Sequence, residues 1–278
     1  MIKEKTQFQF KHASVVKPLS LGAIALFSGM QTHAQERPPN RTLEESFTTH
    51  FDAPLDENDW YVSDFKVKGG IFKNSWSSQN VIATDEGVIL KLTRKLRFGL
   101  FPYFEGGELQ RRGWFHYGRF EVVMKAPTGG GVVSGFFTHT NDYFGDPHDE
   151  IDIEFLGGQT NSVHLNAYNA SRQIGSKPID MEFDTASAFH LYAFEWTPER
   201  LSWSVDDKPI FQVTDADFDI PDTPQRLIAQ IWTGRFYDWH GLPTFKNDAQ
   251  MHLLCMSYQA ADDVDAEQCS DNVKLPPQ

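Results

Sequence analysis

The sequence predicts an all-β protein, an antiparallel sandwich, on the strength of three observations. Segments of about four to eight residues rich in β-branched and aromatic types recur along the chain, separated by Gly, Asn, Asp or Pro. Convincing amphipathic helical patterns are absent. Aromatic residues make up 14% of the chain, more than packing requires, so some of them are expected to form a ligand surface.

The chain begins with a segment, residues 1–34, that has the pattern of a secretory signal peptide. Four lysines precede an apolar run of 12 residues at 19–30, and small residues precede an expected cleavage site after Ala34. Because a membrane-spanning helix needs roughly 20 apolar residues, a retained anchor is the weaker interpretation. We therefore expect a secreted or periplasmic protein.

Charge and length limit the class of the mature protein. The signal segment carries four lysines and one glutamate, a net +3, so its removal changes the net charge from −13 to about −16. A chain this acidic lacks the basic stripe that nucleic acids and anionic membranes require, and a neutral or cationic ligand fits better. Residues 35–278 contain no repeat or low-complexity tract, which suits a single large sandwich domain, expected to be a monomer.

The clearest strands are expected at residues 88–93, 117–125 and 201–205. The sequence Asp-Asp-Lys-Pro at 206–209 follows the last of these and is typical of a hairpin turn. The chain then returns in a strand at 210–213. Such hairpins join antiparallel neighbours, as the sandwich requires.

Residues 149–155, with the sequence Asp-Glu-Ile-Asp-Ile-Glu-Phe, are the most informative segment of the chain. Side chains in a strand alternate between its two faces, so the apolar members of this segment face a core. The acidic members share the opposite face: Glu150, Asp152 and Glu154.

Like charges on one strand face repel, so a purely structural strand would avoid this pattern. The pattern suits chemistry that needs one carboxylate ionised as a nucleophile, another protonated as an acid, and a third group that separates their pKa values. The alternatives are a calcium site or a solvated acidic face, although the segment lacks the loop geometry that supplies most calcium ligands.

The segment around these acids, residues 148–157 (His-Asp-Glu-Ile-Asp-Ile-Glu-Phe-Leu-Gly), resembles the active-site signature of glycoside hydrolase family 16. Further stretches look, in order, like parts of bacterial lichenases and succinoglycan-depolymerising β-glucanases: 107–109, 117–122, 134–138, 163–168, 189–196 and 231–234. The resemblance covers residues 47–258. It implies a β-jelly roll of two curved antiparallel sheets, concanavalin A-like, with a polysaccharide cleft across the concave sheet. It also implies retaining, endo-acting hydrolases or transglycosylases.

By motif position, the resemblance implies that Glu150 is the nucleophile, Glu154 the general acid/base and Asp152 the helper between them. Spacing alone does not decide between retention and inversion. Two Glu residues four apart in a strand have Cα atoms about 13 Å apart, whereas retention needs carboxyl groups about 5 to 5.5 Å apart. The retaining assignment therefore rests on the resemblance.

The resemblance also implies a set of sugar contacts, in which aromatic rings stack on apolar sugar faces and polar groups bond hydroxyls. These residues are Glu108, Asn166, Tyr168, Trp232 and His148. Further candidates in expected cleft loops are Trp76, Tyr143, His139, Trp239 and His240. Each of them also has a structural interpretation as a core or surface residue.

The sequence departs from the lichenase pattern at several positions. Gln110 replaces an Arg, His148 replaces a Trp, and His139 replaces the Tyr that often follows Thr138. His252 stands where many relatives place an aspartate calcium ligand, so structural calcium is doubtful. We expect no metal at the site and no required cofactor.

The chain has two cysteines, Cys255 and Cys269. In an exported protein a bridge between them would staple the acidic C-terminal tail. The alternative is two free thiols, because the acidic stretch at 262–267 has the composition of a mobile segment.

These observations favour a secreted, retaining endo-β-glucanase that hydrolyses internal β-1,3/β-1,4 linkages of a glucan or glucose-rich exopolysaccharide. The alternatives within the same chemistry are a transglycosylase acting on xyloglucan or another β-glucan, and a galactan hydrolase. A binding module that does not cut would need a damaged catalytic set, and all three carboxylates are present.

Overall fold

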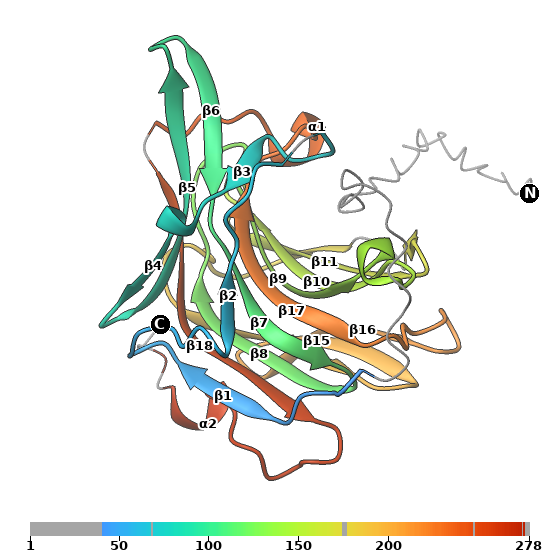
Figure 1. The fold of residues 1–278 in the computed structure, drawn as a ribbon. Helices are drawn as coiled ribbons and strands as arrows, with labels where there is room; N and C mark the ends of the chain where they lie inside the picture. Colours follow the sequence, from blue (N-terminus) through green and yellow to red (C-terminus); the bar gives the residue numbers. More distant parts are fainter. Residues whose placement is uncertain (1–40, 68, 174–176, 247, 274, 276–278) are drawn as a thin grey trace, which may run out of the picture.

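The computed structural model describes residues 41–67, 69–173, 177–246, 248–273 and 275. Within these ranges the chain forms two large β-sheets, and all strand pairs are antiparallel except β3 with β6 (Figure 1). The predicted β-jelly roll is confirmed. The expected signal peptide lies outside the described residues, and no helix within them is long and apolar enough to cross a membrane.

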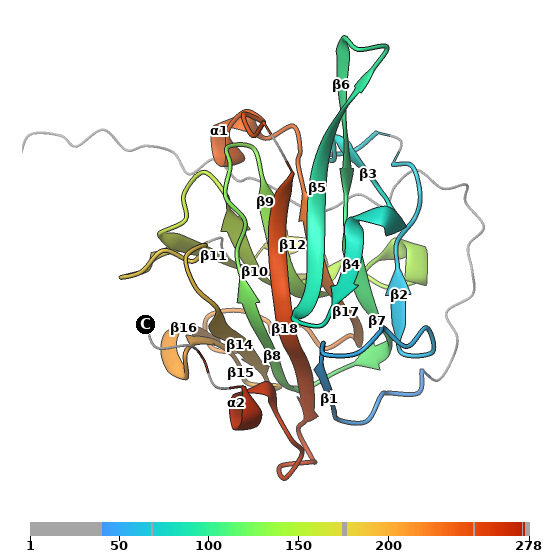
Figure 2. The ribbon, with the colours of Figure 1, turned by 90° about the vertical axis from the view of Figure 1, so that its left-hand side faces the viewer.

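The first sheet has ten strands, with the long strand β18 at its centre (Figure 2). Its order is β16 (Lys208–Thr214), β15 (Arg200–Val205), β14 (His190–Trp196), β8 (Gly118–Lys125), β18 (Ala249–Ala260), β5 (Gly87–Arg97), β6 (Phe101–Gly106) and β3 (Asn74–Trp76). Two short strands pair with it, namely β1 (Phe47–His50) with β18 and β4 (Val81–Thr84) with β5.

The second sheet has eight strands and contains the acidic segment. Its order is β12 (Arg172–Gln173), β11 (Ser162–Asn169), β10 (Asp149–Leu156), β9 (Val133–Thr140), β17 (Gln225–Trp232), β7 (Glu108–Phe115) and β2 (Trp60–Val62), with β13 (Lys177–Asp180) on β11. The helices in the described residues are single turns: η1 (Ser78–Asn80), η2 (Asp142–Phe144), α1 (Tyr237–His240) and α2 (Cys269–Asn272).

The predicted strands are present, and one turn is shorter than expected. Asp206 and Asp207 alone form the turn between β15 and β16, with φ values of 49° and 60°. Aspartate tolerates this left-handed conformation better than most residues. Lys208 and Pro209 already belong to β16, an edge strand of its sheet, where a missing proline N–H is harmless.

The hydrophobic core lies between the two sheets, where alternate side chains of each strand meet. Phe120 and Phe194 stack there with ring centroids 4.8 Å apart. The indole N–H of Trp203, on the ten-stranded sheet, donates to the backbone carbonyl of Asp152 at 3.1 Å. This bond ties the centre of the acidic strand to the opposite sheet, which fixes its position.

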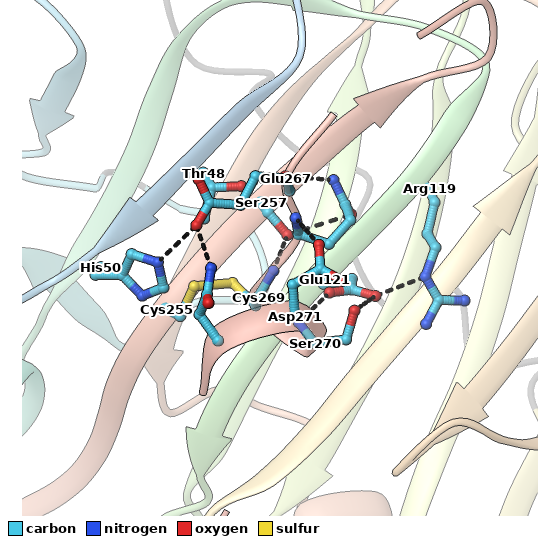
Figure 3. Close-up of a disulfide and its surroundings, with 12 residues drawn as sticks. Thr48, His50, Arg119, Glu121, Cys255, Ser257, Glu267, Cys269, Ser270 and Asp271 are labelled. Atoms are coloured by element: carbon cyan, nitrogen blue, oxygen red, sulfur yellow. Dashed lines mark hydrogen bonds and ion pairs between the residues drawn. A yellow bond between two sulfur atoms is a disulfide. The ribbon is translucent and has the colours of Figure 1, made fainter. Parts of the chain in front are cut away.

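The C-terminal tail is attached to the ten-stranded sheet by a disulfide between Cys255 of β18 and Cys269 of α2. Figure 3 shows that the buried carboxylate of Glu121 accepts hydrogen bonds from the backbone and hydroxyl of Ser270 beside it. Arg119 donates to the same carboxylate at 2.6 Å. The bridge and these bonds hold the tail on the sheet that does not contain the acidic strand.

Candidate active site

The three acids lie on one face of β10, as the alternation predicted. Glu150 and Asp152 have 0% exposure and Glu154 has 3%, while the apolar residues of the other face belong to the core. Because residues on both faces of β10 are buried, the strand is not half-exposed as its pattern suggested. Carboxylates this deeply buried must either pair with donors or keep their protons.

Strand pairing carries the side chains of this face across the sheet in three rows, because directly paired residues point to the same side. The row of the first acid is Tyr168, Glu150, His139 and Arg226. The row of the second is Asn166, Asp152, Phe137, Ile228 and Gln110. The row of the third is His164, Glu154, Gly135, Gln230 and Glu108.

One carboxylate oxygen of Glu150 is held by two imidazoles. His148 Nε2 lies 2.8 Å and His139 Nδ1 lies 3.0 Å from Oε2. Burial would raise the pKa of Glu150, but the hydrogen bonds from His139 and His148 outweigh it and lower this pKa to about 2. The other oxygen, Oε1, is buried and contacts neither imidazole, and hydrogen bonding with Asp152 also lowers the pKa of Glu150.

The pKa values of the other two acids shift in the opposite direction. Burial, followed by the negative charge of Glu150, raises the pKa of Asp152 well above its usual value. Burial and the same charge also raise the pKa of Glu154. A single strand face therefore carries one carboxyl group whose pKa is lowered beside two whose pKa values are raised, which is the division that acid-assisted nucleophilic chemistry needs.

All five predicted sugar contacts lie on the same face, and four of them belong to the three rows or adjoin them. The ring of Tyr168 stacks on that of His148 with centroids 4.7 Å apart, and Asn166 accepts from Gln173 at 3.0 Å. Burial raises the pKa of Glu108, against the hydrogen bonds that it accepts from its neighbours. Its donors are Ser63 and Gln110, at 2.5 and 2.9 Å. Gln110, which stands where lichenases usually have an Arg, is thus a hydrogen-bond donor to Glu108.

Trp232 lies on the same face, one row beyond Gln230, where it packs with three of the further candidates in an aromatic cluster. Trp232 is fully buried, with Phe72 5.1 Å and Trp239 6.1 Å from it between ring centroids. Trp76 is buried in the same cluster, and His240 lies against Trp232. Phe72 and these rings cover Trp232, so its role as a sugar contact stays a prediction. By contrast, Tyr143 is exposed on η2.

His164 lies directly opposite Glu154 and was not among the residues predicted from the sequence. Trp239 donates its indole N–H to Nδ1 of this histidine at 3.4 Å. Burial lowers the pKa of His164 to about 4, so the imidazole is neutral near pH 7. The alternation that places Asn166 and Tyr168 on this face extends to position 164, so the signal was present in the strand pattern.

Arg226 is the second residue that the sequence analysis missed, and it ends the row of Glu150. Its guanidinium lies 5.4 Å from the ring centroid of Trp114. Burial and then the charge of Arg112 lower the pKa of Arg226, while Glu44 opposes them. No pattern in residues 225–232 marks this arginine, because only the register of β17 on β9 brings it beside His139.

Comparison with known proteins identifies the family of the chain. The family model described as glycosyl hydrolases family 16 matches residues 69–250. The chain is 34% identical over 219 residues to a beta-glucanase of Brevibacillus brevis, covering 78% of this chain and 81% of that one. It is 36% identical to a beta-glucanase of Bacillus subtilis strain 168, covering 72% and 80%.

Among solved structures, the Bacillus licheniformis beta-glucanase superposes with a TM-score of 0.73 at 31% identity, covering 78% of this chain and 99% of that chain. A beta-1,3-1,4-glucanase (lichenase) from a mouse hindgut metagenome gives 0.72 at 33% identity, with the same coverage. The chain therefore belongs to family 16 of the glycosyl hydrolases and is a glycoside hydrolase.

Proposed function

We propose that the protein is a secreted endo-β-glucanase that hydrolyses internal β-1,3/β-1,4 linkages with retention of anomeric configuration. The observation that carries this proposal is the buried acidic face of β10, on which His139 and His148 hold Glu150 and lower its pKa, while burial and the charge of Glu150 raise the pKa of Glu154. The relatives named beta-glucanase and lichenase support the choice of a mixed-linkage glucan as substrate.

In the first step, Oε1 of Glu150 attacks the anomeric carbon, because Oε2 is occupied by the imidazoles of His139 and His148. Glu154 gives its proton to the departing glycosidic oxygen. In the second step Glu154, now ionised, takes a proton from water, which attacks the anomeric carbon and breaks the ester bond to Glu150. Two displacements at one carbon restore the original configuration.

Asp152 stands between the two and is proposed to stay neutral and to hydrogen-bond the nucleophile. If it stayed ionised beside Glu150, two adjacent charges in a buried site would raise the pKa of the nucleophile. Its raised pKa keeps it neutral instead. The proposed sugar contacts are Glu108, Asn166, Tyr168, Trp232 and His148, with His164 added by its place opposite Glu154.

The proposal needs no cofactor. His139, His148 and Glu150 are close enough to form a metal-ligand set, but both imidazoles point at one oxygen of Glu150 at hydrogen-bond distance. The surroundings of His252 do not fit a calcium ion, because burial and then the charges of Lys125 and Lys91 lower the pKa of this histidine. The two lysine ammonium groups would repel a dication, and a neutral imidazole offers nitrogen where calcium prefers oxygen ligands.

A substrate panel tests the proposed activity. Lichenan, laminarin, xyloglucan, succinoglycan and agar would be compared by release of reducing ends. We expect lichenan to be cut fastest, into oligosaccharides rather than single glucose units. Cleavage of agar alone would favour the galactan hydrolase, and cleavage of none of the polymers would contradict the proposal. A transglycosylase shares the first step, and sizing products made with a labelled acceptor oligosaccharide separates it from a hydrolase.

The pKa directions predict an asymmetric pH profile. The nucleophile must be ionised, and its pKa of about 2 means that it stays ionised until the medium is strongly acidic. The acid must be protonated, and its raised pKa means that kcat/KM falls as pH rises through that value. We expect a plateau that extends far into acid and ends on the alkaline side. An alkaline limb that persists unchanged in Glu154→Gln, measured on an activated aryl glycoside, would contradict this assignment.

A further inference from the structure

A two-stranded hairpin projects from the end of the ten-stranded sheet, and we call residues 93–104 the β5–β6 finger (Figures 1 and 2). Strand β5 pairs with β18 only as far as Leu92 and with β4 only as far as Leu90. Beyond Leu92, β5 pairs with β6 alone. Five strand residues, 93–97, rise about 17 Å, so the tip stands well clear of the sandwich.

The tip of the finger exposes large apolar side chains. Leu96 is 55% exposed, Phe98 85%, Leu100 76% and Phe101 64%. The other exposed large apolar side chains in the described part of the chain are scattered singly: Leu43, Tyr61, Tyr143, Leu242 and Val264. Single exposed residues are ordinary, whereas a contiguous apolar group on a projection marks a contact surface.

The turn at the tip places an aromatic residue where the backbone disfavours it. Phe98 has φ of 53° and Gly99 has φ of 69°, and the backbone N–H of Leu100 donates to the carbonyl of Arg97 at 3.1 Å. Such turns favour Asn, Asp or Gly at both central positions, and a bulky residue at positive φ is strained. Phe98 is too exposed for packing within the chain to offset this strain, so a contact outside the chain is the better explanation.

The finger is also basic in an acidic protein. Residues 93–104 contain Arg94, Lys95 and Arg97 and no acid, whereas the whole chain carries −13. Lys95 pairs with Glu105 at the base of the finger, and the guanidinium of Arg97 lies 5.8 Å from the centroid of the Tyr103 ring. The negative net charge of the whole chain predicted no contact with anionic membranes, but it does not reflect this local excess of positive charge in the finger.

We propose that the β5–β6 finger docks the protein onto an anionic lipid surface. Phe98, Leu100 and Phe101 enter the boundary between headgroups and acyl chains, while Arg94 and Arg97 contact the phosphates. The acidic body does not prevent this, because the tip is about 17 Å from the sheet and the Debye length is about 8 Å at physiological salt. Leucine has no ring to stack on a sugar, which favours lipid over polysaccharide as the partner.

Vesicle sedimentation tests the proposal on the full-length chain after signal removal. The double variant Phe98→Asp/Leu100→Asp would be compared with Val264→Asp, a matched change at an exposed apolar residue outside the finger. We expect binding to vesicles of equimolar phosphatidylcholine and phosphatidylglycerol, and a loss of about tenfold or more in the finger variant only. Arg94→Gln/Arg97→Gln should reduce binding to these vesicles toward that of pure phosphatidylcholine, and added salt should weaken binding by the unaltered protein.

Several outcomes would overturn the proposal. Equal sedimentation of the finger variant and Val264→Asp would remove the finger from any membrane contact. A sedimentation coefficient that increases with protein concentration in the absence of vesicles, in the unaltered protein but not in the finger variant, would assign the tip to contact with a second copy of the chain. If a gel containing β-glucan retarded the finger variant less than the unaltered protein, the finger would be assigned to polysaccharide binding. Because the acids lie in the other sheet, hydrolysis of soluble glucan tests the proposed function separately.

Discussion

Glu150→Gln is expected to reduce kcat on β-glucan by at least about 10⁴-fold, because no covalent glycosyl-enzyme can form without the carboxylate. The amide has nearly the same shape as the carboxylate and still offers an oxygen to His139 and His148, which hold the side chain in place. We therefore expect the fold and the affinity for an oligosaccharide to survive. Reducing-end release measures kcat, and titration calorimetry with a mixed-linkage tetrasaccharide measures binding.

Glu121→Gln is the matched control for this variant. Glu121 is also a fully buried glutamate on a β-strand, but it lies on the ten-stranded sheet, where it bonds Arg119 and Ser270. Its amide variant should lower the free energy of unfolding and leave kcat near that of the unaltered protein. Near-normal hydrolysis by Glu150→Gln, or an equal loss of kcat in both variants, would remove the nucleophile assignment.

The acids could be placed from sequence because the period of a strand is fixed by its backbone. Alternation puts Glu150, Asp152 and Glu154 on one face wherever the strand lies. The contacts that set their pKa values come from register instead. His139 meets Glu150 only because β9 pairs with β10 at that position, and Arg226 joins the row from a strand much later in the chain.

Features that depend on how loops and strand ends pack could not be read from sequence in the same way. Trp232 has the sequence context of a cleft residue, yet it is covered by Phe72, from a segment far away in the chain, and by Trp239, from the helix that follows β17. The β5–β6 finger has an ordinary strand pattern, and its exposure follows from the absence of pairing partners beyond Leu92. The disulfide was one of two open alternatives, because cysteine spacing alone does not place α2 beside β18.

The electrostatics of the strand also explain why three acids are needed rather than two. Burial would raise the pKa of Glu154 even if it were the only other acid beside Glu150. Asp152 adds a polar, neutral group in the buried space between these two glutamates. An apolar residue there could not respond to charge on Glu150 as the glycosyl bond forms and breaks. The three acids of Glu-x-Asp-x-Glu are thus coupled through Glu150, whose negative charge raises the pKa values of both Asp152 and Glu154.

Glu154→Ala separates the two steps of the proposed reaction. On glucan, where the leaving sugar needs a proton, kcat/KM should fall by about 10² to 10⁴-fold. On an aryl glycoside with a good leaving group the first step no longer needs the acid, so the glycosyl-enzyme should form at a near-normal rate and accumulate. Its hydrolysis should be slow, because no base remains to take a proton from water.

Azide should then rescue the variant, because this anion attacks the anomeric carbon without a base and fits the space left by the deleted carboxyl group. The expected product is a β-glycosyl azide, and its configuration, read by proton NMR, tests retention directly. An α-glycosyl azide would indicate a single displacement and an inverting enzyme. A correctly folded variant that azide does not rescue would assign the acid/base role to another residue, with Asp152 and its raised pKa as the next candidate.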